Sequence, residues 1–228
     1  MGKDNQPKER QKIDLARKRE KRSTYDRILI VCEGTKTEPQ YFKEIQVRYR
    51  LQTANVQVEP SQLGTSPRQV VEYARDLFLN GSLRKDIQQK SFDQVFAVFD
   101  RDDHVNYHEA LQLVASLDGK LRNDLKKSVP FRSIASVPCF ELWLLLHYEN
   151  IQHPIHRDEV QHRLKKYIPE YEKGTGGYFE LTRSQMAIAT QRARSLSSQT
   201  TAHDGHQPYT DVDILANLLV SLGKPMPV

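Results

Sequence analysis

Acidic side chains that could bind a metal ion stand directly after two strongly apolar runs of the chain. Glu33 follows the first run, and Asp100, Asp102 and Asp103 follow the second. A charge without a partner is costly in such surroundings, and a shared cation would offset the repulsion between the carboxylates. Hard oxygen ligands of this kind suit Mg²⁺ or Mn²⁺. The sequence therefore predicts a divalent-metal site with these four residues as ligands.

Each acid taken alone also has a structural interpretation. A carboxylate at the end of a strand can cap the following helix, or it can pair with a basic neighbour such as Arg101. We favour the metal site because both acidic groups follow apolar runs in the same way.

The two apolar runs are predicted strands. Residues 28–32 and 95–99 are short, continuous and rich in β-branched or aromatic residues, which is typical of strands buried on both faces. Residues 56–58 and 134–137 are two further strand candidates. Helices are predicted at residues 39–49, 66–80, 111–117 and 140–147. Strands that alternate with helices indicate an α/β fold with a mostly parallel sheet flanked by helices.

The alternation ends near residue 150. The remaining apolar spacing predicts helices at residues 157–167, 184–198 and 212–222. We therefore divide the chain into a basic arm (1–24), an α/β domain (25–150) and a helical C-terminal extension (151–228).

The position of the acids suggests their chemistry. In an open parallel sheet, ligands bind beyond the carboxyl ends of the strands, where the strand order reverses. Mg²⁺ in such a place can orient a phosphate, stabilise developing charge and lower the pKa of bound water. The turn after Glu33 could bring Glu38 back towards it, Lys36 could contact a phosphate oxygen, and Glu141 could bind a second metal ion.

The order of the acids separates related folds. Response-regulator receivers carry an acidic pair after the first strand, where this chain has Glu33 alone. Haloacid-dehalogenase-type phosphatases need Asp-x-Asp after the first strand, whereas here Asp100 and Asp102 follow a later one. One Glu first and Asp-x-Asp later is the Toprim pattern, which topoisomerases, primases and several nucleases share.

Three segments resemble RloB-like proteins, in the same order along the chain. They are Arg27 to Phe42 (RILIVCEGTKTEPQYF), Val98 to Asp103 (VFDRDD) and Val137 to His147 (VPCFELWLLLH). The resemblance implies a bacterial protein encoded near restriction or abortive-infection loci, often beside an ATPase partner. It also implies a relationship to Toprim effectors of phage defence that cut DNA or RNA, transfer RNA included. By position, it implies catalytic roles for Glu33, Glu38, Asp100, Asp102 and Glu141.

Basic residues suggest contact with nucleic acid. Residues 1–27 hold ten Lys or Arg and five Asp or Glu, so they account for the whole net charge of +5. A basic arm suits binding to a phosphate backbone, although a solvated helix reads the same way. Further basic groups could line one groove with Tyr167 and Tyr178, or could be ordinary solvated faces. The candidate nucleic-acid residues are Lys36, Arg101, Lys126, Lys127, Lys165 and Lys166.

Several other functions lack the residues they need. No apolar run approaches the roughly 20 residues of a membrane span, and no signal-peptide core is visible, so we expect a cytoplasmic protein. Cys32 and Cys139 suit buried positions, and His153 and His156 lack partners for a zinc site. The run 174–177 lacks the end of a P-loop, which leaves a flexible loop as the simplest interpretation.

Two functions remain open. The first is a Mg²⁺- or Mn²⁺-dependent nuclease that hydrolyses DNA or RNA. The second is a non-catalytic module that binds nucleic acid or an ATPase through the arm and the helical extension. The sequence gives no positional reason to assign a tyrosine as the nucleophile. Hydrolysis is therefore favoured over strand passage.

Overall fold

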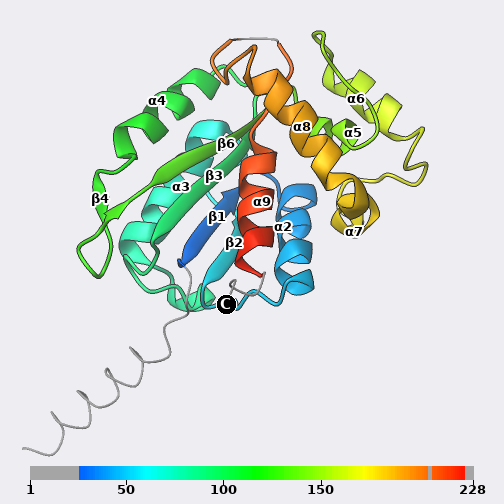
Figure 1. The fold of residues 1–228 in the computed structure, drawn as a ribbon. Coiled ribbons are helices and arrows are strands. Elements are labelled where there is room, and N and C mark those ends of the chain that lie inside the picture. The colour runs from blue at the N-terminus through cyan, green and yellow to red at the C-terminus, as the bar shows by residue number, and fades with distance from the viewer. Residues whose placement is uncertain (1–25, 205–206, 224–228) are drawn as a thin grey trace, which may run out of the picture.

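The computed structural model describes residues 26–204 and 207–223, so the predicted arm at residues 1–24 lies outside the described residues. A five-stranded sheet in the order β2-β1-β3-β6-β7 forms the centre of the fold (Figure 1). The first four of these strands are parallel, and β7 is antiparallel to β6. The predicted α/β fold with a mostly parallel sheet is thereby confirmed. The strands are β1 (Ile28–Cys32), β2 (Val56–Pro60), β3 (Gln94–Asp100), β6 (Phe131–Val137) and β7 (Tyr209–Thr210).

The order of the strands reverses at β1. The chain passes from β1 to β2 on one side and returns to place β3 on the other side of β1. The carboxyl ends of β1 and β3 therefore flank the point at which ligands bind in open parallel sheets.

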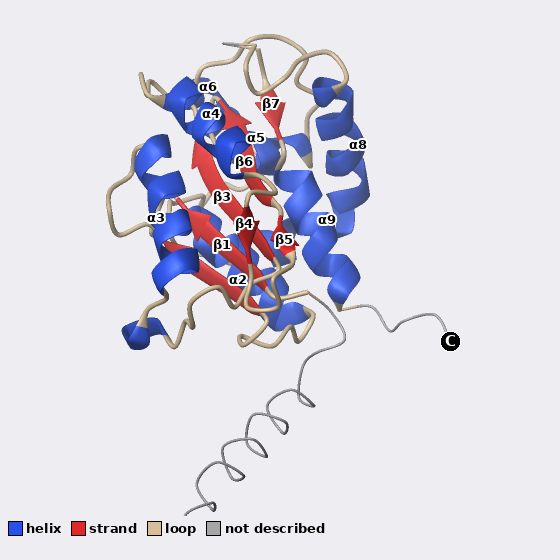
Figure 2. Cartoon of the chain, turned by 90° about the vertical axis from the view of Figure 1, so that its left-hand side faces the viewer, coloured by secondary structure: helices blue, strands red, loops and turns tan. Residues whose placement is uncertain are grey.

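Helices cover both faces of the sheet (Figure 2). Side chains of β1 alternate between two apolar cores: Ile28 and Ile30 face one, and Leu29 and Val31 face the other. The first core contains side chains of α2 (Thr37–Arg48), α5 (Glu141–Leu146), α8 (Met186–Ser197) and α9 (Val212–Leu222). The second contains side chains of α3 (Pro67–Asn80) and α4 (Tyr107–Leu117). Burial on both sides explains why the strands are continuous apolar runs.

The C-terminal part of the chain packs on the sheet and extends it. Side chains of α6 (Arg157–Leu164), α7 (Tyr178–Thr182), α8 and α9 belong to the first core, which contains Ile28 and Ile30 of β1. The sequence predicted α9 with its observed bounds but predicted no strand after residue 150, whereas β7 pairs with the end of β6. The short 3-10 helices η1 (Leu83–Lys85) and η2 (Arg183–Gln185) complete the helical elements of the described residues. No helix in the described part of the chain is long and apolar enough to cross a membrane.

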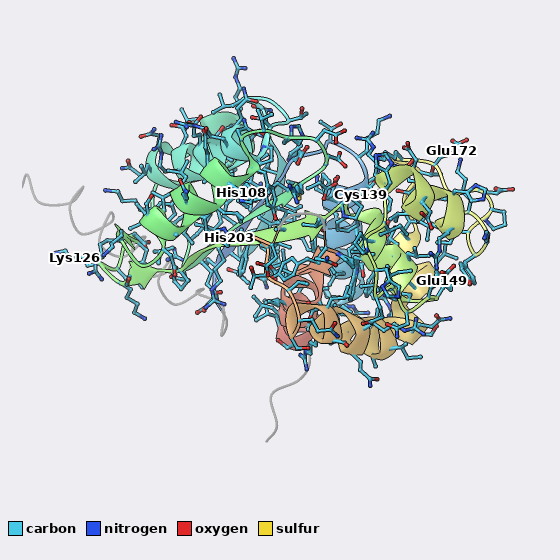
Figure 3. The ribbon with its side chains drawn as sticks, turned by 90° about the horizontal axis from the view of Figure 1, so that it is seen from above. His108, Lys126, Cys139, Glu149, Glu172 and His203 are labelled. Carbon is cyan, nitrogen blue, oxygen red and sulfur yellow. The ribbon has the colours of Figure 1, made fainter. Side chains whose placement is uncertain are left out.

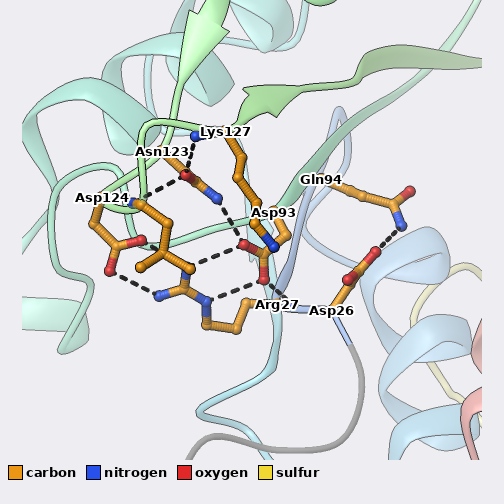
Figure 4. A network of polar contacts seen from close by, with 8 residues as sticks. Asp26, Arg27, Asp93, Gln94, Asn123, Asp124 and Lys127 are labelled. Atoms are coloured by element: carbon orange, nitrogen blue, oxygen red, sulfur yellow. Dashed lines mark hydrogen bonds and ion pairs between the residues drawn. The ribbon is translucent and has the colours of Figure 1, made fainter. Parts of the chain in front are cut away.

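A polar network connects the amino-terminal ends of neighbouring strands (Figure 4). Arg27, just before β1, pairs with Asp93 at 3.1 Å and with Asp124 at 2.8 Å. Asp124 lies in the loop between β4 (Leu121–Arg122) and β5 (Ser128–Val129), a hairpin that the sequence did not predict. Asn123 donates to Asp93 at 2.7 Å. This network ties together the starts of β1 and β3 and the hairpin that precedes β6.

Candidate active site

Glu33 and Asp100 meet across neighbouring strand ends. Glu33 directly follows β1, and Asp100 is the last residue of β3. The Glu33 Oε2 atom accepts a hydrogen bond from the Asp100 backbone amide at 2.9 Å, and Glu33 Oε1 lies 3.1 Å from His104 Nε2. The Asp100 side chain is buried, and none of the described residues donates a hydrogen bond or forms an ion pair with its carboxylate. The parallel pairing of β1 with β3, as expected from the sequence, thus places both acids at the same end of the sheet.

Asp102 lies in the turn that leaves β3. Its backbone amide donates to the carbonyl of Pro138 at 3.0 Å, which attaches the turn to the end of β6. Its φ of +37° is uncommon for a residue with a side chain. Oδ2 of Asp102 accepts from Arg157 Nη1 at 3.1 Å, while Oδ1 is buried without a hydrogen-bond partner. Asp103 is exposed and lies on the rim of an adjoining cleft.

Glu38 folds back over the turn from which its helix starts. It lies in the first turn of α2, and a Cβ atom added to Gly34 would lie 2.5 Å from Glu38 Oε2. The carboxylate therefore occupies space beside Gly34 that any larger residue at position 34 would contest. This matches the return towards Glu33 predicted from the sequence.

Glu141 begins α5 and is buried beside two residues from a distant loop. Glu141 Oε1 accepts from the Tyr171 hydroxyl at 2.8 Å and lies 3.2 Å from Lys173 Nζ. Its other oxygen, Oε2, is buried and has no hydrogen-bond partner. Tyr171 is itself buried, so its hydroxyl positions Glu141 and is not accessible to a nucleic acid strand as a nucleophile.

The electrostatics show that the carboxylates share one environment. Burial raises the pKa of Glu33 to about 8, with further increases from the charges of Glu38 and Asp102. Burial also raises the pKa of Glu38 and that of Asp100, and the negative charge of Glu141 adds to both shifts. The pKa of Asp102 is raised by burial too, against the opposing charge of Arg157. Burial is thus the main cause of these raised pKa values, and the repulsion between neighbouring carboxylates adds to it.

Glu141 differs from the other acids in its pKa. Burial acts to raise the pKa of Glu141, but the charge of Lys173 and the hydrogen bond from Tyr171 outweigh it, and the pKa is lowered. The pKa of Glu141 is thus shifted towards the ionised form, opposite in direction to the shifts of its acidic neighbours. The difference comes from the two partners that the loop around Lys173 supplies.

The donor chemistry suits a divalent cation, although the ligands are not preassembled. In the described part of the chain, no group of three or more His, Cys, Asp or Glu side chains is arranged to hold a metal ion. The cluster nevertheless offers buried oxygens without partners on Asp102 and Glu141. Oxygen donors that repel one another are the kind that Mg²⁺ and Mn²⁺ bind. Glu33, Asp100 and Asp102 fit such an ion by type, with Glu38 and Glu141 beside them.

Four residues at the site were not predicted to act there. His104 pairs with Glu33, Arg157 with Asp102, and both Tyr171 and Lys173 with Glu141. His104 follows the predicted acidic turn closely, so its proximity could be read from the sequence. For Lys173 the available signal was the adjacent glycine-rich run at residues 174–177.

The glycine-rich loop at residues 174–177 makes several hydrogen bonds to α2. Gln40 Nε2 donates to the Gly174 carbonyl at 3.0 Å. The Glu44 carboxylate accepts from the backbone amides of Gly177 at 2.5 Å and Phe179 at 2.8 Å. Gly174 has a φ of +94°, and a Cβ atom there would lie 2.8 Å from the Lys36 side chain. The loop therefore needs glycine at this position to approach α2.

The predicted nucleic-acid residues do not line one groove. Lys126 and Lys127 lie in the β4–β5 hairpin before β6, near the amino-terminal ends of the strands, whereas the acids lie at the carboxyl ends. Figure 3 shows Lys126 and Glu172 at opposite ends of the molecule. Tyr178 is buried, with its hydroxyl bonded to the backbone of Glu172, so it offers no face for stacking. Of the two arrangements that the sequence left open, one shared groove is therefore not found for Lys126, Lys127 and Tyr178.

The remaining basic candidates lie in three different settings. Lys36 is exposed and packs against Gly174 beside the acids. Arg101 lines the cleft next to Asp102. Lys165 and Lys166 are exposed and follow the end of α6, one helix length from Arg157 at its start. Their contact with nucleic acid stays a prediction.

An open cleft adjoins the acids. Its volume is about 260 Å³. Its apolar part comes from the end of β6 and the segment before α6, and its charged part from the turn after β3 and from Arg157. The lining includes Arg101, Asp102, Pro138, Pro154, Ile155 and Arg157.

The fold and the site define an α/β protein with a cluster of acids at the switch point of a mostly parallel sheet. A family model described as RloB-like protein matches residues 28–219, so the chain belongs to the RloB-like family. The match covers most of the chain and includes the residues of the cluster. Neither the curated proteins nor the solved structures that were compared gave a match.

Proposed function

We propose that this protein is a Toprim-type nuclease that hydrolyses DNA or RNA phosphodiesters with the help of Mg²⁺ or Mn²⁺. The observation that supports the proposal is the clustering of carboxylates at the switch point, where their mutual repulsion calls for a cation. Glu33, Asp100 and Asp102 would hold the ion, and Glu38 and Glu141 would assist. Such an ion lowers the pKa of water and stabilises charge that develops on a phosphate.

The chain's own residues would prepare the site for that chemistry. The Asp100 amide and His104 fix the orientation of the Glu33 carboxylate through its two oxygens. Tyr171 and Lys173 keep Glu141 ionised, so that it can contribute a charged oxygen.

The biological setting of the proposal rests on the family resemblance. We propose a role as the effector of a bacterial anti-phage system, acting in the cytoplasm with a neighbouring ATPase as partner. Transfer RNA is one candidate among the nucleic acid substrates. Sequencing of nucleic acid ends from cells that express the chain with the ATPase, against an Asp100→Ala control, would identify the substrate.

Cleavage assays test the enzyme directly. We expect DNA or RNA cleavage that depends on Mg²⁺ or Mn²⁺ and disappears in Asp100→Ala and Asp102→Ala proteins that remain folded. Glu109→Ala is the matched control, because Glu109 is an exposed acid whose partner Arg68 lies on α3. Phage defence that persists in folded Asp100→Ala and Asp102→Ala proteins would sink the catalytic proposal.

A second candidate is a module that binds nucleic acid or an ATPase without catalysis. One observation favours it: Asp102 and Glu141 already have cationic partners in Arg157 and Lys173. This candidate predicts that the Asp100→Ala protein keeps both its partner binding and its role in defence. The cleavage and defence assays above therefore separate the two functions.

A further inference from the structure

Two cations from the C-terminal part of the chain reach into the acidic cluster. Arg157 Nη1 lies 3.1 Å from Asp102 Oδ2, and Lys173 Nζ lies 3.2 Å from Glu141 Oε1. The side chains of Arg157 and Lys173 are 39% and 50% exposed, whereas those of Asp102 and Glu141 are 18% and 2% exposed. The cations therefore lie on the solvent side of the carboxylates, at the mouth of the site.

The backbone around Lys173 is built to hold it there. On the C-terminal side of Lys173, the Gln40 and Glu44 side chains of α2 form hydrogen bonds to the backbone of Gly174, Gly177 and Phe179. On its N-terminal side, the Tyr178 hydroxyl accepts from the amide of Glu172 at 3.0 Å and donates to its carbonyl at 2.7 Å. The helix that holds the loop is the one that carries Glu38, so Lys173 and this acid are positioned together.

Charge explains why such cations are needed. Glu33, Glu38, Asp100, Asp102 and Glu141 would repel the phosphates of an approaching strand. Arg157 and Lys173 are the Arg and Lys residues that form ion pairs with these five acids within the described residues. Both side chains could exchange a carboxylate for a phosphate oxygen, and a divalent ion held by the acids would favour that exchange. Arginine binds phosphate through its planar fork, and lysine binds it as a point charge.

The cleft beside Arg157 supplies room for the rest of a nucleotide. Pro138, Pro154 and Ile155 give it an apolar surface that suits the flat face of a base. Arg157 lines the same cleft and pairs with Asp102, which also lines it. A strand whose phosphate contacts Arg157 can therefore place a neighbouring base in the cleft.

We propose that Arg157 and Lys173 form a two-point clamp that binds phosphates of a nucleic acid strand across the acidic cluster. The inference rests on the proposed nuclease function and names the residues that hold its substrate. In the free protein, the ion pairs with Asp102 and Glu141 keep the two side chains in place. In the complex, both contact the strand.

Binding to labelled oligonucleotides tests the clamp. The probes are a fluorescein-labelled single-stranded 20-nucleotide DNA and the matching RNA, measured by anisotropy with the full chain in Ca²⁺. Arg157→Met and Lys173→Met are each expected to weaken binding about tenfold. Each should also reduce the slope of log K against log salt by about 1, because one phosphate contact is lost. Lys120→Met should change neither quantity, because Lys120 is an exposed lysine directly before β4, at the opposite ends of the strands from the acids.

Further variants separate binding from a merely structural role. Lys173→Met leaves Glu141 buried without its cation, so the protein could lose stability. The double variant Lys173→Met with Glu141→Gln removes that charge, and Lys173→Arg keeps the cation. We expect the double variant to fold but still to show the reduced salt slope, and Lys173→Arg to restore most of the binding.

The outcomes distinguish the clamp from the nuclease. If the wild-type protein does not bind the probes, or if folded Arg157→Met and the double variant bind with unchanged affinity and salt slope, the clamp is wrong. Metal-dependent cleavage that is lost in Asp100→Ala would still support the nuclease in that case. If the clamp variants weaken binding but the wild-type protein cleaves neither probe nor cellular nucleic acid, the clamp stands and the nuclease fails.

Discussion

The backbone amide of Asp100 donates a hydrogen bond of 2.9 Å to the carboxylate of Glu33, and so joins the ends of two neighbouring parallel strands. The bond orients Glu33 but gives nothing to the Asp100 carboxylate, which is 6% exposed and close to the charges of Glu38, Glu33 and Glu141. Asp100 is therefore the acid whose charge the free protein compensates least. Substitution of Asp100 should therefore show separately how much stability its buried charge costs and whether the site binds a metal ion.

Asp100→Asn should stabilise the metal-free protein and remove its response to metal. The amide keeps the shape of the side chain and relieves repulsion among buried charges, so we expect a gain of about 1 kcal/mol or more. That gain corresponds to a rise in Tm of roughly 2–4 °C for a chain of this size. Thermal unfolding in EDTA and in Mn²⁺ measures both effects. Glu109→Gln should leave Tm and its Mn²⁺ response unchanged, and an Mn²⁺ response retained in Asp100→Asn would contradict the predicted site.

The stability of the metal-free protein should fall as the pH rises from about 4.5 to 8. Folding raises the pKa of Glu33 from 4.5 to about 8, so the folded state binds more protons than the unfolded state in this window. Unfolding therefore becomes easier as the pH increases, by at most about 5 kcal/mol from this group. Urea unfolding in EDTA at pH 5.5 and pH 8.5 should show a larger loss for wild type than for Glu33→Gln. Equal losses in the two proteins would refute the raised pKa.

Gly174→Ala should displace Lys173 from the acidic cluster. Gly174 combines a φ of +94° with a Cβ position 2.8 Å from the Lys36 side chain, so alanine is strained and also collides. Gly177 has a similar φ of +81° but open space around its Cβ position, which makes Gly177→Ala the matched control. Both variants carry the backbone cost of about 1 kcal/mol. Only Gly174→Ala should weaken binding of the labelled oligonucleotides, and equal binding by both variants would count against a role for the loop.

The sequence was sufficient to predict the two strands at whose ends Glu33 and Asp100 lie. Residues 28–32 and 95–99 are buried on both faces, so each forms an apolar run that needs no periodicity to be recognised. Their parallel pairing then brings Glu33 and Asp100 to one edge of the sheet. By contrast, β7 has two residues, Tyr209 and Thr210, and its pairing with β6 depends on where α8 and α9 pack. Two residues carry no periodic signal from which a strand could be predicted.

The cations of the site could not be predicted in the same way. Arg157 meets Asp102 across 55 positions of sequence, and no local pattern distinguishes it from the other exposed basic residues. Its role follows from the packing of α6 against α5. Lys173 stood beside a run of glycines, and that run indicates an unusual backbone without indicating what it approaches. Side chains brought together by tertiary contacts between loops require the folded structure.

Arg27→Met should destabilise the protein at a place far from the acids. Arg27 is 16% exposed and pairs with Asp93 and Asp124 (Figure 4). Among the described residues, its removal leaves Asp93 with Asn123 as its remaining side-chain donor. Because the network is only partly buried, we expect a loss of about 2 kcal/mol, below the range for fully buried pairs. Urea unfolding at pH 6 measures it. Arg68→Met, which removes an exposed pair between α3 and α4, should leave the midpoint unchanged.

The pH dependence of this loss identifies Asp93 as its source. Burial acts to raise the pKa of Asp93, but the hydrogen bonds and charge of Arg27 outweigh it, and the pKa is lowered below 3.8. The stability that Asp93 contributes is therefore fully present above pH 3.8 and is lost as the pH falls through its folded-state pKa. The difference in unfolding free energy between wild type and Arg27→Met should stay constant from pH 8 to pH 5 and shrink below pH 3.8. A difference that does not shrink there would assign the loss to packing of the Arg27 side chain, and the ion pair would then contribute little to holding the strand starts together.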